Sequence, residues 1–316
     1  MFLKKNIMAA AITVCSVLAF AGCKEKAPSA NVFKDIPEEA ETPVKAELSL
    51  VNEDSETIES VQEKVNPEVE RAKVVYGKMS PRFKDDVKID DWEAFLADLK
   101  NVLNEEKKYR QDDLPLYFLI DKQHTVGSDY EPKDLLLLTA NDHYNLNKKG
   151  LYLRPDVEKE LRKMADAALK DGVKLLVSST YRSYQYQDNL FNYWVSVDGL
   201  AEAERESARP GTSQHQLGVA IDFGSIDDSF AETKMGAWMY SHAAEYGWSL
   251  SFPKNYEDVT GYRWESWHFR YLGIPAVQFQ KKYFNDVQQF MLEFINAWKE
   301  EVEKDNELAA LQPEIM

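Results

Sequence analysis

The sequence predicts an α+β fold: an antiparallel sheet flanked by helices, with extra helices at both ends. Two observations predict it. The apolar runs suited to strands are short and separated by long connections, whereas a parallel α/β fold alternates strands and helices regularly. Amphipathic patterns with helical spacing stand near residues 92–103 and 284–298, on either side of these runs. The 316 residues are 44% hydrophobic, enough to build a core for most of that fold.

The first 22 residues have the pattern of an export signal. Two lysines precede an apolar run from residue 7 to residue 20, which is shorter than the roughly 20 residues that span a membrane. Ala21 and Gly22 lead directly into Cys23, an arrangement that resembles a bacterial lipoprotein cleavage site. We therefore expect an exported bacterial lipoprotein that is anchored to a membrane by a lipid on Cys23 and faces the periplasm or cell wall.

Residues 23–67 are acidic and polar, contain three prolines and lack a sustained apolar period. This composition predicts a tether, and a disordered leader without a function is equally compatible with it. The formal net charge of −16 argues against a nucleic-acid partner, because binding to nucleic acid relies on lysine and arginine. Cys15 lies inside the signal, so the mature chain has no pair of cysteines for an internal disulfide.

Residues 68–112 predict a helical extension. The first helical signals run from Pro67 to Lys78, and a clearer helix follows a capping residue at Asp90 or Asp91. The apolar positions of this second helix recur at three-and-four spacing: Trp92, Phe95, Leu96, Leu99, Val102 and Leu103. An apolar face of that width predicts packing against a larger body.

Residues 113–275 hold the remaining strand signals and are expected to form the domain that carries the site. The predicted strands are residues 116–120, 173–178, 217–222, 248–252 and 262–269. Helices are predicted from Pro155 to Asp171, from Tyr184 to Val195 and from Glu232 to Tyr246. Residues 276–316 predict a C-terminal helix with an aromatic face. That face could meet a membrane, but the acidic residues beside it favour packing on the body.

Two of the five histidines, His215 and His268, fall in two segments that each also contain a carboxylate. His215 precedes an alternating strand pattern in which Asp222 occupies the position of a core residue, and such a carboxylate needs a partner charge or a metal. Glu265 and His268 follow about fifty residues later. Neutral imidazole and carboxylate are the ligands of catalytic zinc, which keeps its fourth position for water. We interpret His215, Asp222 and His268 as zinc ligands and Glu265 as the general base.

Taken singly, each histidine has an ordinary structural explanation, in an aromatic core strand for His268 and in a polar turn for His215. The spacing also raises a difficulty, since residues seven apart on a flat strand point to opposite faces. Gly218 offers a bend, so we expect His215 in the loop before the strand and Asp222 inside it. No metal role is expected for the other three histidines, which are His124, His143 and His242.

Four segments resemble a known family. The run Ser213-Gln-His215-Gln-Leu-Gly218-Val-Ala220-Ile-Asp222, followed by Glu265-Ser-Trp267-His268, resembles the VanY-type D-alanyl-D-alanine carboxypeptidases, zinc peptidases that trim cell-wall stem peptides. Residues 179–187, STYRSYQYQ, resemble a Ser-Gly-Tyr-Arg-Ser-x-x-x-Gln segment of that family, with Thr180 in place of the glycine. Residues 130–135 resemble its Tyr-x-Pro-x-Asp-Leu segment.

The resemblance implies a zinc-dependent carboxypeptidase that removes the terminal D-alanine from peptidoglycan stem peptides. Arg182 is suited to hold a terminal carboxylate or a developing oxyanion by bidentate hydrogen bonds. Gln187 and Ser213 are expected to bind substrate as neutral donors; alternatively, Gln187 supplies an orienting amide and Ser213 caps the loop. An L,D-carboxypeptidase and an endopeptidase on peptidoglycan stay open as alternatives. A non-catalytic zinc-fold binding module is disfavoured because Glu265 is present.

Overall fold

The computed structural model describes residues 66–109 and 114–311, without the side chains of residues 308–311. These residues belong to one compact unit, Gln62–Met316. The signal, the tether and the lipidation site at Cys23 lie outside the described residues. None of the described helices is both long and apolar enough to cross a membrane.

A five-stranded sheet carries the fold, in the order β2 (Asn145–Leu146), β4 (Leu176–Ser179), β5 (Ala220–Phe223), β7 (His268–Tyr271) and β6 (Trp248–Leu250). The three pairs formed by β4, β5, β7 and β6 are antiparallel, while β2 runs parallel to β4. A separate antiparallel pair joins β1 (Leu136–Leu137) to β3 (Tyr152–Leu153). The predicted α+β class is therefore correct, with one parallel pair at an edge of the sheet.

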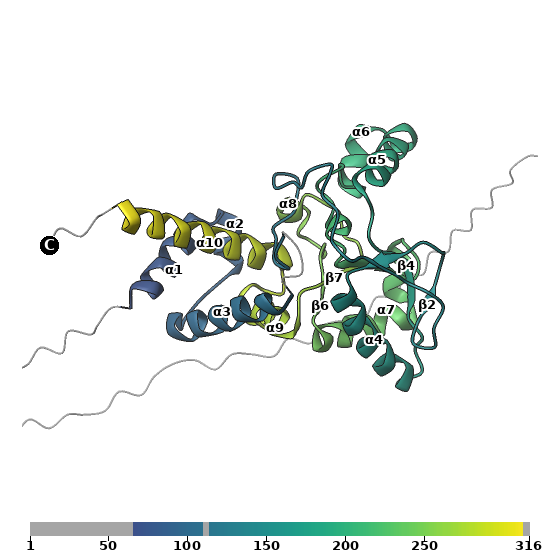
Figure 1. Ribbon diagram of the computed structural model, residues 1–316, viewed down its shortest axis with the longest axis horizontal. Helices are drawn as coiled ribbons and strands as arrows, with labels where there is room; N and C mark the ends of the chain where they lie inside the picture. The colour runs from purple at the N-terminus through teal and green to yellow at the C-terminus, as the bar shows by residue number, and fades with distance from the viewer. Residues whose placement is uncertain (1–65, 110–113, 312–316) are drawn as a thin grey trace, which may run out of the picture. The chain divides into compact units, whose positions relative to one another are not determined.

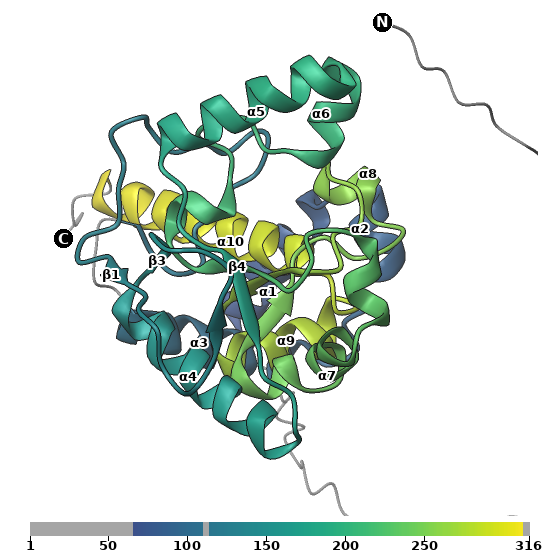
Figure 2. The same cartoon turned by 90° about the vertical axis from the view of Figure 1, so that its right-hand side faces the viewer.

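Helices lie on both sides of this sheet. α4 (Pro155–Lys170) and α7 (Lys234–His242) lie on one side, and α5 (Tyr184–Asp198) and α6 (Leu200–Glu206) lie on the other (Figures 1 and 2). The helix predicted from Glu232 to Tyr246 is α7 continued by a 3₁₀ turn, Ala243–Tyr246. The other 3₁₀ segments are Lys107–Tyr109, Gln214–Leu217 and Asp228–Glu232.

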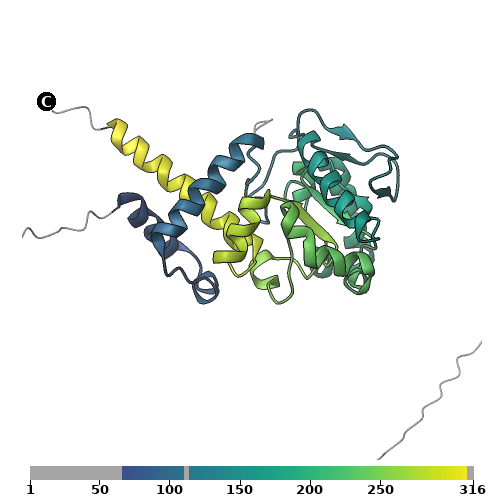
Figure 3. The same cartoon turned by 90° about the horizontal axis from the view of Figure 1, so that it is seen from below.

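The extra helices at both ends pack together. They are α1 (Pro67–Lys78), α2 (Pro81–Asp86), α3 (Trp92–Glu106), α9 (Ile274–Tyr283) and α10 (Gln288–Leu311), and α8 (Glu257–Thr260) is a single turn between β6 and β7. Asp91 caps α3 as predicted, because its side chain accepts a hydrogen bond from the amide of Ala94. Figure 3 shows α3 crossing α10, and the ring of Phe95 lies 5.1 Å from that of Phe294.

The C-terminal stretch is two helices, whereas the sequence predicted one. Asn285 and Asp286 adopt left-handed backbone conformations, with φ of 50° and 58°, so the chain turns between α9 and α10. The apolar residues of this stretch are buried: Phe284, Val287, Phe290, Met291, Phe294, Ile295 and Trp298. The prediction that they pack on the body, and do not face a membrane, is confirmed.

The strand predicted at residues 116–120 is wrong, although most of its side chains are buried. The guanidinium of Arg270 donates to the carbonyl oxygens of Leu116 and Phe118, at 2.8 and 2.9 Å. These two carbonyl oxygens therefore accept hydrogen bonds from a buried side chain. In a strand, they would accept them from the backbone amides of a neighbouring strand. The strand predicted at residues 262–269 starts only at His268, because a turn spans Glu265 to Trp267.

Candidate active site

The strands place two of the three predicted ligands next to each other. Asp222 in β5 pairs directly with His268, the first residue of β7. His215 reaches the same point from the 3₁₀ turn Gln214–Leu217, which Ser213 caps by accepting the amide of His215. Gly218 then reverses the chain with φ of 69°, a conformation that glycine adopts without strain. The bend expected at Gly218 is therefore confirmed.

The three side chains converge. The distance from His215 Nε2 to Asp222 Oδ2 is 3.3 Å, and that from His268 Nδ1 to Asp222 Oδ1 is 3.2 Å. Within residues 66–109 and 114–311, this is the one cluster of three or more potential ligands, with atoms within 4.8 Å of one another. His124, His143 and His242 lie elsewhere, each hydrogen-bonded to an acidic side chain.

Outer hydrogen bonds set which nitrogen of each ring faces the cluster. His215 Nδ1 lies 2.7 Å from the carbonyl oxygen of Thr180, which can only accept, so Nδ1 carries the proton. His268 Nε2 lies 3.3 Å from Gln214 Oε1 and donates to it in the same way. Nε2 of His215 and Nδ1 of His268 are therefore the ring nitrogens that face the cluster. Metal-binding histidines are commonly held by such partners.

Two atoms of the cluster show that the site suits a cation. His215 Nε2 and Asp222 Oδ1 are buried, and each faces another atom of the cluster, at 3.3 and 3.2 Å, without making a hydrogen bond to any described residue. Buried polar atoms left without partners are costly, and a bound cation would satisfy both. Two imidazoles and one carboxylate are also a donor set typical of catalytic zinc. The residues present therefore fit the metal that the sequence predicted.

The electrostatics follow from burial and close charges. Burial and then Arg182 lower the pKa of His215 to about 4. Burial alone would lower the pKa of His268, but the carboxylates of Asp222 and Glu265 raise it to about 9. Burial would raise the pKa of Asp222, but the two rings hold it well below its ordinary value. The cluster is thus built around one ionised carboxylate.

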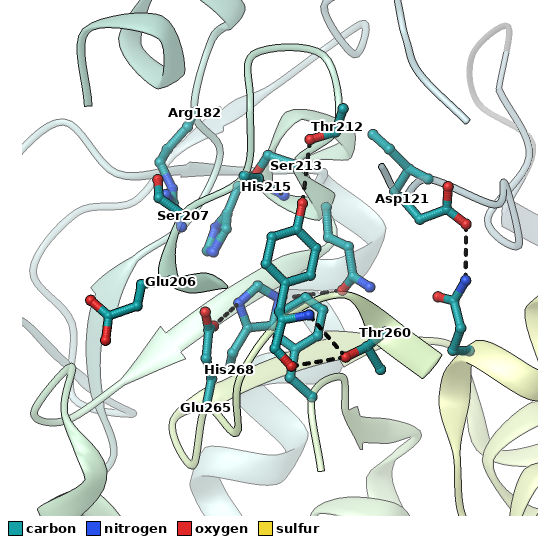
Figure 4. Close-up of a pocket in the computed structure, with 16 residues that line it drawn as sticks. Asp121, Arg182, Glu206, Ser207, Thr212, Ser213, His215, Thr260, Glu265 and His268 are labelled. Atoms are coloured by element: carbon teal, nitrogen blue, oxygen red, sulfur yellow. Dashed lines mark hydrogen bonds and ion pairs between the residues drawn. The ribbon is translucent and has the colours of Figure 1, made fainter. Parts of the chain in front are cut away.

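Glu265 lies beside the cluster in the turn before β7. Its Oε2 is 3.3 Å from His268 Nδ1, and burial raises the pKa of its carboxyl group above the ordinary value. Glu265 is nevertheless not sealed off, because it lines both a small cavity and a larger groove (Figure 4). A carboxylate in this position can accept a proton from a group bound at the cluster.

Arg182 follows β4 and also lines both the cavity and the groove. Its Nη2 is 3.3 Å from Asp222 Oδ2, and its Nη1 donates to Gln187 Oε1 at 3.0 Å. Gln187 is fully buried, and its amide donates to Ala208 O and Ser207 Oγ. Both donor hydrogens of Gln187 are therefore used, which supports the orienting role and leaves none for a substrate. Ser213 caps the turn and lines the cavity.

Sequence reasoning missed three residues at this site. Gln214 contacts His268, and Asp121 and Gln289 line the same cavity (Figure 4). Gln214 lay inside the segment already singled out, so its place next to His215 was a usable signal. Asp121 and Gln289 are far from the other site residues in sequence, and nothing in their local pattern indicates that they meet there.

The family model for VanY, described as D-alanyl-D-alanine carboxypeptidase, matches residues 150–274. The bifunctional D-Ala-D-Ala dipeptidase and carboxypeptidase VanXYC of Enterococcus gallinarum is 32% identical over 169 residues, which cover 85% of that protein and 51% of this chain. The chain belongs to the VanY family.

Two further similar proteins are informative. YodJ of Bacillus subtilis (strain 168), described as a candidate carboxypeptidase, is 36% identical over 166 residues, and the chain spans only 61% of its length. The solved structure of the LdcB LD-carboxypeptidase, which concerns the molecular basis of peptidoglycan recognition, matches this chain with a TM-score of 0.50 and 33% sequence identity. That match covers 85% of LdcB and 57% of this chain, so a large part of this VanY-family protein lies outside it.

Proposed function

We propose that this VanY-family protein is a zinc-dependent D-alanyl-D-alanine carboxypeptidase that removes the terminal D-alanine from peptidoglycan stem peptides. The observation that carries the proposal is the cluster of His215, Asp222 and His268, with its unpartnered buried atoms, placed beside Glu265 where a cavity meets a groove. The relatives that are named as D-Ala-D-Ala carboxypeptidases support the same substrate class.

In this proposal, different residues of the chain have different roles in hydrolysis. His215, Asp222 and His268 would hold the zinc, which supplies Lewis acidity where the scissile carbonyl lies. Glu265 accepts the proton of the attacking water and passes it to the leaving amine. Arg182 brings a fixed positive charge to the same place, and Gln187 holds that guanidinium in one orientation.

The two spaces that Glu265 lines differ in size. The cavity lined by Ser213, Arg182 and Glu265 has a volume of about 40 Å³, whereas the groove on the other side of Glu265 has about 450 Å³. We assign the leaving D-alanine to the cavity and the rest of the stem peptide to the groove. Arg182 and Ser213, at the edge of the cavity, are then placed to bind the free carboxylate of the last residue.

A second candidate is an L,D-carboxypeptidase that acts on tetrapeptide stems. The match to LdcB, at 33% identity over 85% of that chain, favours it. Digestion of defined muropeptides, followed by mass spectrometry, separates the two. We expect loss of D-alanine from pentapeptide stems. Cleavage confined to tetrapeptide stems would move the protein to the L,D class with the same metal chemistry, and cutting within crosslinked peptides would make it an endopeptidase.

We also propose that the protein works as an exported lipoprotein, held to a membrane by a lipid on Cys23 and facing the periplasm or cell wall. The lysines, the apolar run and the small residues before Cys23 support this location. Peptidoglycan, the proposed substrate, lies in the same compartment. A tether at residues 23–67 would let the membrane-anchored enzyme reach peptidoglycan at a distance from the membrane.

A further inference from the structure

A second groove adjoins the small cavity, on the side away from the groove that we assign to the stem peptide. This second groove has a volume of about 560 Å³ and runs along α10, where Glu293, Asn296 and Glu300 line it. Asp121, Thr260 and Gln289 line both the second groove and the small cavity. These three residues therefore form the partition between the two spaces.

A hydrogen bond spans this partition. The side-chain amide of Gln289 donates to Asp121 Oδ2 at 2.9 Å (Figure 4) and to Glu293 Oε1 at 2.9 Å. The other oxygen of Asp121 accepts the backbone amides of Gln123 and His124, each at 2.8 Å. Both ends of the bridge are thus fixed, one to a loop and the other to the first turn of α10.

We propose that the bridge between Gln289 and Asp121 is the end wall of the leaving-residue cavity and makes the enzyme an exopeptidase. This inference rests on the proposed function. If the scissile bond lies at the metal cluster, a substrate that continues past the leaving residue must cross the bridge to reach the second groove. The bridge blocks that path, so Gln289 is a specificity-determining residue.

The charge of Asp121 adds to this selection. Its Oδ2 is occupied by the Gln289 amide, and without that donor an unpaired carboxylate oxygen would face the cavity that receives the substrate's terminal carboxylate. Loss of Gln289 would then both open the wall and repel a free carboxylate. Both effects shift the preference toward substrates with a neutral or extended end.

The residue that sets this selection lies outside the part of the chain that the VanY family model matches, residues 150–274. Gln289 is the second residue of α10, and α10 belongs to the C-terminal extension. We therefore assign the C-terminal extension a direct role in substrate selection.

The test compares Gln289→Ala with the wild type on two stem peptides. One ends in a free D-alanine carboxylate, and the other carries one further residue beyond that alanine. We expect the ratio of kcat/KM for the extended peptide to that for the free peptide to rise about tenfold or more in Gln289→Ala. Asn296→Ala is the matched control, because Asn296 lines the second groove on α10 but not the cavity, and its ratio should stay at the wild-type value.

A second variant, Gln289→Glu, keeps the shape of the side chain and replaces the bridge by repulsion between carboxylates, so it should shift the ratio in the same direction. Melting temperature and zinc content are measured for each variant to confirm an intact fold. A wild type that releases no D-alanine from the free peptide would overturn the proposed function. An active wild type with an unchanged ratio in both Gln289 variants would overturn the end wall alone.

Discussion

At the scale of single residues, the proposed function assigns some groups to metal binding and another group to proton transfer. His215 and His268 each give one ring nitrogen to an outer acceptor and keep the other for the cluster. Glu265 approaches His268 without taking part in the strand pairing that fixes Asp222. Substitutions at these positions should therefore fall into two distinguishable classes.

The first class is metal retention. The purified wild-type protein should contain about one zinc ion per chain, and His215→Ala or Asp222→Ala should empty the site, because two ligands hold a metal far more weakly than three. Elemental analysis after dialysis provides the measurement. His242→Ala serves as a control, since that histidine contacts only Glu245 and a neighbouring ring. Full zinc in either ligand variant would remove that residue from the ligand set.

The second class is proton transfer. Glu265→Gln should keep its zinc and lose turnover by about a hundredfold or more, because an amide has the shape of the carboxyl group but cannot accept the proton. Turnover and zinc content are measured on the same sample. Hydrolysis near the wild-type rate would mean that the base lies elsewhere.

Arg182 provides a test of carboxylate recognition. Arg182→Lys should lower kcat/KM about tenfold or more, since an ammonium group cannot reproduce the fork that contacts Gln187 and Asp222 together. Amidation of the substrate's terminal carboxylate should weaken cleavage in the wild type for the same reason. Arg205→Lys, an exposed ion-pair partner of Glu202 and Glu257, is the matched control. Equal cleavage of free and amidated peptides would favour an endopeptidase.

At the residue level, the sequence could indicate which four residues lie together, while their roles stay predictions. The indication came from a carboxylate at a core position of a strand and from Gly218, whose bend accounts for the seven-residue spacing. Gln187 was less predictable, since the sequence does not show that both of its donor hydrogens are used by Ser207 and Ala208.

At the scale of elements, α10 reaches the candidate metal site through two hydrogen-bonded glutamines. Gln288, the first residue of α10, accepts the Gln214 amide at 3.1 Å, and Gln214 in turn accepts His268 Nε2 at 3.3 Å. Ser251 donates to both glutamines. The orientation of a predicted zinc ligand therefore depends on where the C-terminal helix starts.

Gln214→Ala should weaken zinc binding about tenfold, because His268 loses the acceptor that fixes its tautomer. Gln288→Ala should act in the same direction with a smaller effect, since Ser251 still holds Gln214. Competition with a chelator gives both affinities. Zinc affinity unchanged in Gln214→Ala would show that His268 is oriented by its strand alone.

The elements themselves were predicted unevenly, for physical reasons. Helices with caps and a clear apolar face were found, since those signals are local. Residues 116–120 are as apolar as the residues of a buried strand. Their backbone carbonyl groups, however, accept hydrogen bonds from Arg270, which lies more than 150 residues away in sequence. The break at Asn285 and Asp286 was missed because apolar residues that become buried, Phe284 and Val287, continue on both sides of it.

At the scale of the whole molecule, the described helices of both extensions share one hydrophobic cluster with the sheet. Phe95 of α3 contacts Phe279 of α9 at 5.1 Å and Tyr283 at 4.9 Å between ring centroids. The sequence predicted that these helices pack on a body, but not that they pack on each other. Pairing between segments so distant in sequence is not encoded in the periodicity of either segment.

Location is also a property of the whole molecule. If Cys23 carries a lipid, the wild-type protein should fractionate with membranes and Cys23→Ala should move to the soluble fraction, because the acyl chains supply the membrane affinity. Cell fractionation with detection of the protein provides the measurement, and Cys15→Ala should leave the location unchanged. A wild-type protein found only in the soluble fraction would contradict the lipid anchor.

The side-by-side packing of α1 and α10 has a mechanical consequence. Arg71 pairs with Asp305 at 2.7 Å and Lys78 with Glu301 at 2.5 Å, so the two helices are joined along their length (Figure 1). A force that acts on α1 passes to its neighbours α3 and α10. Because α10 starts at Gln288, which accepts a hydrogen bond from Gln214 beside His268, α10 connects α1 to the candidate site.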